Sequence, residues 1–125
     1  MPGNNKILSF LGIARKADRL FAGMDAVAES LKNGKACLLI IAEDISQRSA
    51  ERLIRMAKEK NIPTRRLRGT IAELSTAIGK KAGIVAVADK GFTKRLLELF
   101  QEQSTADKEG AETEKRSNYG EEYAI

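Results

Sequence analysis

Two neighbouring acidic residues, Glu43 and Asp44, are the best-placed candidates for acid–base chemistry in this sequence of 125 residues. They follow an apolar run at 36–42 that is typical of a buried strand, and α/β enzymes place catalytic groups after such strands. The chain has no histidine, which excludes His-based triads and imidazole metal ligands. Adjacent acids in such a loop are more often turn formers and helix caps. We therefore expect no enzymatic activity, no metal and no cofactor.

The single cysteine, Cys37, lies inside the same apolar run. One cysteine cannot form an internal disulfide or a Cys-rich zinc site. Its apolar neighbours predict that Cys37 is a small core residue.

A glycine-flanked basic segment at 79–83, Gly-Lys-Lys-Ala-Gly, has residue types that suit phosphate binding. It is predicted to lie between a helix and the following strand. A nucleotide-binding loop needs the reverse order, strand then loop then helix, so that the helix amides face the phosphate. The segment therefore does not predict a nucleotide site.

The net charge of +5 is unevenly distributed along the chain. Residues 101–125 contain three basic and seven acidic residues, a net charge of −4, and have no periodic apolar face. Residues 1–100 contain nineteen basic and ten acidic residues, a net charge of +9. We therefore expect one basic domain at 1–100 and an acidic, disordered C-terminal tail at 101–125.

The basic residues of the domain form four clusters, which together favour a polyanionic partner. These clusters are Arg15-Lys16 with Arg19, Lys32 with Lys35, Arg65-Arg66 with Arg68, and Lys80-Lys81. The few phenylalanines are mostly at helical core spacing, which does not suit a base-stacking sheet. The remaining possibility is that the protein binds folded RNA and recognises its phosphates and its shape.

No apolar run approaches the ~20 residues that a membrane-spanning helix needs. The first residues lack the charged start and apolar core of a signal peptide. We therefore expect a cytoplasmic protein without membrane contact.

Apolar periodicity and capping signals predict helices that alternate with short strands. The predicted helices are 4–17, 24–33, 46–60, 70–79 and one beginning near 91, and the predicted strands are 36–42, 64–68 and 84–88, with a minor strand near Leu20. This order predicts an α/β fold, a three-layer α/β/α sandwich with a mixed four-stranded sheet and helices on both faces.

Five short blocks of sequence, in consistent order over about residues 5–100, carry a resemblance to a known family. The blocks are LGIARKA at 11–17, AGMDAV at 22–27, LIIAED at 39–44, LSTAIG at 74–79 and VADKGF at 87–92. Together they resemble the YlxQ-like bacterial proteins of the ribosomal protein L-seven-Ae superfamily, which includes binders of sharply bent kink-turn RNA. The resemblance implies an α/β/α sandwich and no enzymatic activity.

The resemblance also implies two neighbouring RNA-binding segments: the start of the helix after Gly23, and the loop at 79–83. We expect Gly23, Met24 and Asp25 to meet RNA at close backbone range. The basic residues expected to hold phosphates are Lys16, Arg19, Lys35, Lys80 and Lys81.

The sequence departs from the kink-turn binders in the first of these segments. Their helix opens with Asn-Glu-x-x-Lys, where this chain has Asp25, Ala26 and, in the lysine position, Glu29. In the second segment, Lys80-Lys81 stands where strong binders have an apolar Val/Ile-Pro loop. We therefore expect RNA binding that is weaker than that of the kink-turn readers or different in specificity.

Two functions remain open from the sequence. The first is a ribosome-associated, monomeric binder of structured RNA. The second is a protein-interaction module on the same fold whose RNA site is eroded by Ala26 and Glu29, because the superfamily also includes stress-response members that act through protein partners.

Overall fold

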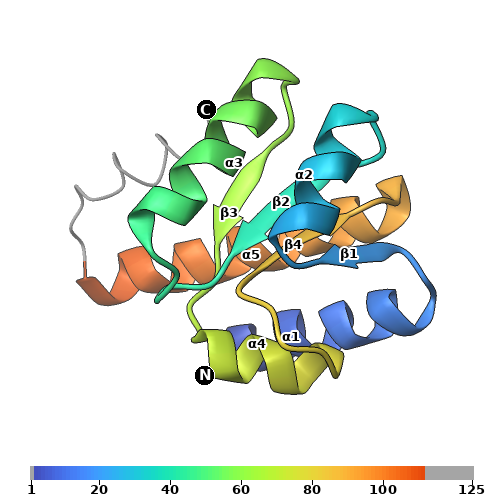
Figure 1. Cartoon of the computed structure of the whole chain (residues 1–125). Coiled ribbons are helices and arrows are strands. Elements are labelled where there is room, and N and C mark those ends of the chain that lie inside the picture. The colour runs from blue at the N-terminus through green and yellow to red at the C-terminus, as the bar shows by residue number, and fades with distance from the viewer. Residues whose placement is uncertain (1, 112–125) are drawn as a thin grey trace.

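The computed structural model describes the backbone of residues 2–111 and the side chains of residues 6–103. Over this part of the chain, helices alternate with strands in three layers (Figure 1). The elements are α1 (Pro2–Lys16), β1 (Leu20–Ala22), α2 (Met24–Lys32), β2 (Leu38–Ile41), α3 (Gln47–Glu59), β3 (Thr64–Arg66), α4 (Ile71–Ile78), β4 (Ile84–Val87) and α5 (Lys90–Ala111). The predicted sandwich is confirmed, and the minor strand near Leu20 is present as β1.

The four strands form a mixed sheet in the order β1-β4-β2-β3. Strand β4 pairs antiparallel with both β1 and β2, whereas β2 and β3 are parallel. Every residue of the two central strands is buried. This agrees with their uninterrupted apolar sequences, because a strand that is covered on both faces buries all of its side chains and therefore lacks the alternation of apolar and polar residues.

Alternate residues of the central strands pack into two separate cores. Leu38 and Ile40 face the core that also contains residues of α1, α4 and α5. Leu39 and Ile41 face the core that contains residues of α2 and α3. The sheet is therefore covered by three helices on one face and two on the other (Figure 1).

Side-chain caps fix the starts of three helices. The Ser46 hydroxyl accepts a hydrogen bond from the Ser49 N–H at the start of α3. Thr70 and Glu73 form a complete capping box at α4. A carboxylate oxygen of Asp89 accepts a hydrogen bond from the Phe92 N–H at α5, at 2.8 Å. Because these caps pair backbone groups that would otherwise be orphaned, they set where each connection ends and each helix begins.

Two sequence expectations differ from the structure. Helix α5 does not stop at Phe100 but continues to Ala111, and Gln103 is only 8% exposed. The last helix therefore extends past residue 100, the predicted domain boundary, and it still buries Gln103 where the sequence turns polar. The rest of the predicted tail, 112–125, lies outside the described residues. Cys37 is half-buried rather than a core residue, because it precedes β2 instead of belonging to it.

The strand register places the connections at two opposite ends of the sheet. We call one the Gly23 end, and it comprises Gly23 with segments 42–46, 67–70 and 79–83. We call the other the Arg19 end, and it comprises segments 17–19, 33–37, 60–63 and 88–89. A four-residue strand separates the two ends by about 13 Å, at ~3.3 Å per residue.

Candidate nucleic-acid interface

The backbone of Gly23 joins the start of α2 to the start of β4. Its N–H donates to the carbonyl of Ile84 at 3.0 Å, and its own carbonyl accepts from the Val27 N–H at 3.0 Å. The φ of Gly23 is 99°, in a region that L side chains rarely adopt, so the position requires glycine. Apart from Gly23 and its two chain neighbours, no atom of the described residues lies within 4 Å of the place where a Cβ would stand. The backbone here is therefore open to close approach by a ligand.

The start of α2 has no side-chain cap among the described residues, unlike the starts of α3, α4 and α5. The first amide groups of a helix have no intrahelical acceptor and carry a partial positive charge. An uncapped helix start beside an open glycine suits an anionic oxygen. Asp25 is exposed in this first turn, and Met24 is half-buried against the core of α2 and α3.

The loop at 79–83 lies directly beside Gly23, because Gly83 precedes the Ile84 carbonyl that Gly23 contacts. The loop is held from within the fold. The Ser75 hydroxyl accepts from the Ala82 N–H at 2.9 Å, and the Gly83 carbonyl accepts from the Ala42 N–H at 2.9 Å. These contacts fix the backbone of the loop around two exposed lysines.

Lys80 and Lys81 are both exposed and make no hydrogen bond or ion pair with the side chains that the structure describes. They follow Gly79, whose φ of 74° ends α4 in the left-handed conformation typical of a helix C-terminus. Of the eight predicted site residues, the structure therefore brings together Gly23, Met24 and Asp25 with Lys80 and Lys81.

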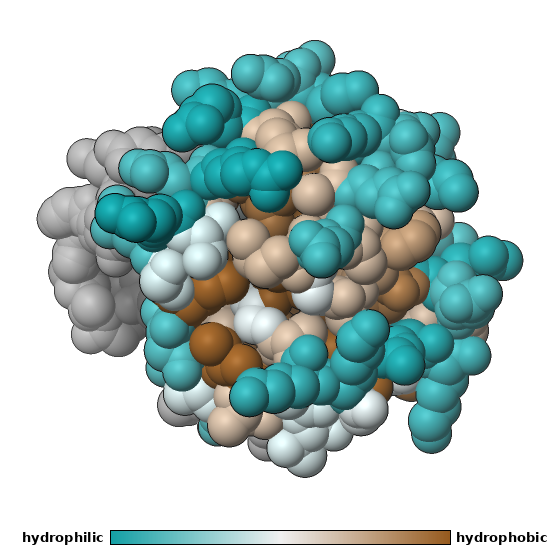
Figure 2. Space-filling model, in the orientation of Figure 1, coloured by the Kyte–Doolittle hydropathy of each residue, from teal (hydrophilic) through white to brown (hydrophobic). Residues whose placement is uncertain are grey.

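Apolar side chains from the connection after β2 and from the start of α4 flank this loop. A Cβ at Gly83 would stand 2.9 Å from Cγ1 of Ile71 and 3.5 Å from Cδ1 of Ile45. Figure 2 shows pale and brown residues gathered at the centre of this view, surrounded by hydrophilic ones. Ile45 and Ile71 were not predicted as site residues. Their only sequence signal is an apolar residue placed next to a helix start, which has no defined partner until the fold is known.

Of the acidic pair after β2, the side chain of Asp44 has a structural role. An Asp44 carboxylate oxygen accepts a hydrogen bond from the Ile71 N–H at 2.7 Å, and so ties the segment after β2 to the start of α4. The backbone N–H of Glu43 donates to the Gly69 carbonyl at 2.9 Å. Both contacts agree with turn and cap formation. Among the described residues, no group of three His, Cys, Asp or Glu side chains could hold a metal ion.

The other three predicted site residues, Lys16, Arg19 and Lys35, do not lie at this interface. The Arg19 carbonyl accepts from the Ala88 N–H at 2.9 Å, which places it at the Arg19 end of the sheet. Lys16 ends α1, and Lys35 lies between α2 and β2, both at the same end. The sequence could not separate the two groups, because strand direction decides which connections share an end.

The cluster of Arg65, Arg66 and Arg68 is only partly solvated. Arg65 is half-buried and donates to the Thr64 carbonyl at 2.9 Å, and its burial lowers the pKa of the guanidinium below its ordinary value. Arg66 donates to the Glu43 carbonyl at 3.3 Å. Arg68 is exposed near the Gly23 end of the sheet.

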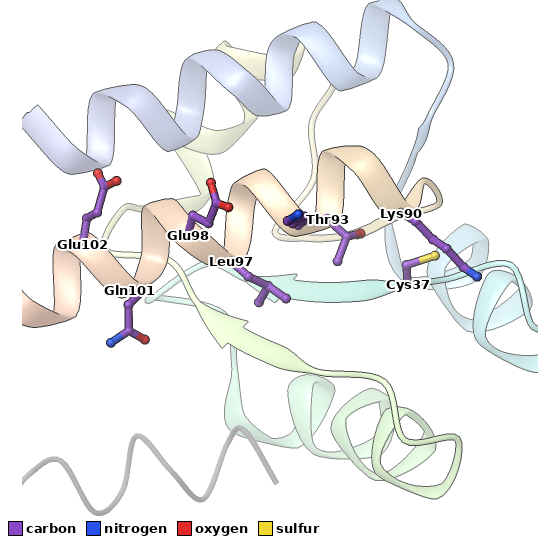
Figure 3. A pocket seen from close by; sticks show the side chains of 8 residues that line it. Cys37, Lys90, Thr93, Leu97, Glu98, Gln101 and Glu102 are labelled. Atoms are coloured by element: carbon purple, nitrogen blue, oxygen red, sulfur yellow. The ribbon is translucent and has the colours of Figure 1, made fainter.

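A hollow lies elsewhere on the described surface, along α5. It has a volume of about 870 Å³ and lies beside Cys37 and one face of α5, from Lys90 to Glu102 (Figure 3). Leu97 points into it from the middle of that face (Figure 3).

Within the described residues, no helix has the length and apolar character needed to cross a membrane.

Known proteins resemble this chain along most of its length. RNA-binding protein YlxQ of Bacillus subtilis (strain 168) is 32% identical over 91 residues, which cover 72% of this chain and 90% of that protein. RNA-binding protein YlxQ of Enterococcus faecium is 26% identical over 96 residues, which cover 77% of this chain and 92% of that protein.

Two solved structures share the fold. A protein of unknown function from Bacillus halodurans has a TM-score of 0.73 at 31% identity, and the match covers 77% of this chain and 97% of that one. The Giardia lamblia 15.5kD RNA binding protein has a TM-score of 0.69 at 16% identity, with 82% of this chain and 88% of that one covered, which is a likeness of fold. Residues 5–97 match one family description, which confirms the resemblance seen in the sequence blocks. The chain belongs to the ribosomal protein L7Ae/L30e/S12e/Gadd45 family.

Proposed function

We propose that this protein binds structured RNA, without catalysis, through the start of α2 and the loop at 79–83. The observation that carries the proposal is the hydrogen bond between the Gly23 N–H and the Ile84 carbonyl at 3.0 Å. It holds an uncapped helix start beside a loop with two exposed lysines. The names of the curated relatives in B. subtilis and E. faecium support RNA as the ligand.

Each part of this interface has a distinct task. The free amides of α2 donate to a phosphate or to a base carbonyl, and Gly23 leaves room for the RNA to approach the backbone. Lys80 and Lys81 attract phosphates without sequence preference. The Asp25 carboxylate can accept a hydrogen bond from a base amino or imino group. Ile45 and Ile71 offer an apolar contact for an unstacked base or a sugar.

Glu29 weakens binding in this arrangement. It is exposed on α2, and no ion pair joins it to Lys32 or Arg19, although all three side chains are described. An unpaired carboxylate one turn from the helix start repels phosphates that approach this helix. We therefore expect lower kink-turn affinity than in family members that carry lysine at this position.

We further propose a cytoplasmic, monomeric protein that associates with the ribosome. The ribosome offers a large amount of structured RNA to which a basic protein of this family can bind. Binding to a kink-turn RNA, a straight RNA duplex and ribosomal RNA across a salt series tests the proposal. We expect measurable affinity for at least one of the three, falling as salt rises. Near-zero affinity for all three contradicts RNA binding.

A second candidate function, a protein-interaction module, is favoured by the hollow along α5. Its lining includes Leu97 beside exposed charges such as Lys94 and Glu98, a mixture typical of the edge of a protein interface. Affinity capture with and without nuclease separates the two functions. Partners lost on RNA digestion support RNA binding, and partners retained in full support direct protein contact.

A further inference from the structure

A second basic surface lies at the Arg19 end of the sheet, away from the proposed interface. It is made of exposed side chains contributed by all four connections at that end or by the helix turns next to them. We call it the Arg19-end surface, and its residues are Lys16, Arg19, Lys32, Lys35, Lys60 and Lys90.

Contacts between the connections hold these residues on one surface. The Arg19 guanidinium pairs with the Asp89 carboxylate at 3.7 Å, which joins the start of β1 to the start of α5. The Cys37 N–H donates to the Val87 carbonyl at 2.7 Å, which joins the segment after Lys35 to the end of β4. The Lys60 ammonium donates to the Lys32 carbonyl at 3.3 Å, which joins the ends of α2 and α3. The four connections therefore lie next to one another, along the upper right of Figure 1.

Few acidic groups oppose this positive charge. Among the side chains that the structure describes, Asp89 is engaged by Arg19 and by the start of α5, and the other acids in these connections and adjoining helix turns are Asp18 and Glu59. At the Gly23 end, by contrast, four acids lie among the basic residues: Asp25, Glu43, Asp44 and Glu73. Counted over the described side chains, the Arg19 end is therefore the more strongly positive of the two.

Local helix stability explains only part of this charge. Lys16 and Lys32 lie in the last turns of α1 and α2, where a cation is favoured by the helix dipole. Lys90 lies at the first position of α5, where the same dipole disfavours a cation. Lys35 follows α2 in a connection and is exposed. These two lysines gain nothing from their own elements and suit an external anion.

We propose that the Arg19-end surface binds the phosphate backbone of a second RNA segment. One molecule then holds two RNA segments, one at each end of its sheet. This rests on the proposed function, because it takes RNA as the ligand of the Gly23 end. The sheet between the two ends is about 13 Å long, so the two RNA segments lie on opposite sides of the domain.

The test uses the full chain and a variant that neutralises three exposed side chains, Lys16→Gln, Lys35→Gln and Lys90→Gln. None of the three side chains makes a hydrogen bond or ion pair with the described side chains, so the fold should be kept. The control with an equal change of charge is Lys6→Gln, Arg52→Gln and Arg55→Gln, all exposed on the outer faces of α1 and α3.

The first measurement is affinity for a kink-turn RNA with a long duplex arm across a salt series. We expect the slope of log affinity against log salt to fall by about 3 in the Arg19-end variant, about 1 for each lysine removed, and to change little in the control. The second measurement is capture of a labelled RNA duplex by protein already bound to an immobilised one. Wild type and control should capture it, whereas the Arg19-end variant should bind only the immobilised duplex.

The outcomes separate this proposal from the proposed function. If the wild type binds none of these RNAs, both are wrong. If the wild type binds RNA and the Arg19-end variant matches the control in slope and capture, the second surface is wrong and the Gly23 end stands. Capture retained by the variant also excludes the second surface, because a dimer with two Gly23 ends would then account for it.

Discussion

A Cβ added at Gly12 would stand 2.7 Å from the carbonyl oxygen of Ala77. This is closer than real Cβ atoms come to backbone, so helices α1 and α4 pack at a separation that only glycine allows. Helix α4 leads directly into the loop at 79–83. The close contact therefore sets the position of one half of the proposed RNA interface.

Gly12→Ala should lower the free energy of unfolding by about 1–2 kcal/mol, because the helices must separate. The direction of this change is informative, because a glycine-to-alanine substitution inside a helix otherwise raises the free energy of unfolding by up to ~1 kcal/mol. Urea unfolding gives the change. Ser9→Ala, exposed on the same helix, is the control, with an expected change within about 0.5 kcal/mol. A Gly12 variant as stable as wild type would show that α1 and α4 can move apart freely.

Gly23→Ala should lower both stability and RNA affinity. The φ of 99° is strained for alanine, which costs about 1–3 kcal/mol, and the new methyl group occupies the open space before α2. Gly34→Ala is the matched control, because Gly34 also has a positive φ of 73° and nothing within 4 Å of its Cβ position. Unfolding should respond to both changes, whereas kink-turn RNA affinity should fall only at Gly23. Equal losses of affinity would mean that Gly23 acts through folding alone.

Glu29→Lys should strengthen RNA binding. The exposed side chain lies one turn from the start of α2, and reversing its charge replaces repulsion of phosphate by attraction. We expect affinity at low salt to rise about tenfold and the salt slope to increase by about 1.

Glu51→Lys, exposed on α3, makes the same change of charge on a different helix. It should raise affinity much less, through net charge alone. Equal effects of the two variants, or none from Glu29→Lys, would place the RNA elsewhere on the protein.

The helices and strands could be predicted because their signals are local. Ser46, Thr70 and Glu73 cap helices by contacts within three residues, and such contacts are visible in sequence spacing. The sheet order was not predicted in detail, because β4 pairs with β1 and β2 across long stretches of chain. The continuation of α5 past Phe100 was missed, since a polar composition hides the burial of Gln103.

The grouping of the candidate site residues could be predicted only in part, because their grouping depends on contacts that are distant in the sequence. The residues near Gly23 and in the loop at 79–83 came from the family resemblance, and the structure brings them together. Lys16 and Lys35 were assigned to the same surface, but strand direction carries them to the Arg19 end. Charge clustering in a sequence therefore indicated the kind of partner without dividing the basic residues between two surfaces.

Removing residues 112–125 should raise RNA affinity at low salt. These residues contain four glutamates against Lys115 and Arg116, and a net negative segment attached to a basic domain competes with RNA phosphates for its lysines. The cut after Ala111 keeps all of α5, including the buried Gln103.

The measurement is affinity for kink-turn RNA at low and high salt. Competition of this kind is electrostatic, so the gain from truncation should shrink as salt screens both partners. The control is the full chain with each of the four glutamates replaced by glutamine, which keeps the length and removes the negative charge. A gain in the truncated chain but not in this control would assign the effect to the bulk of the segment. No gain in either would mean that the segment leaves the basic surfaces free.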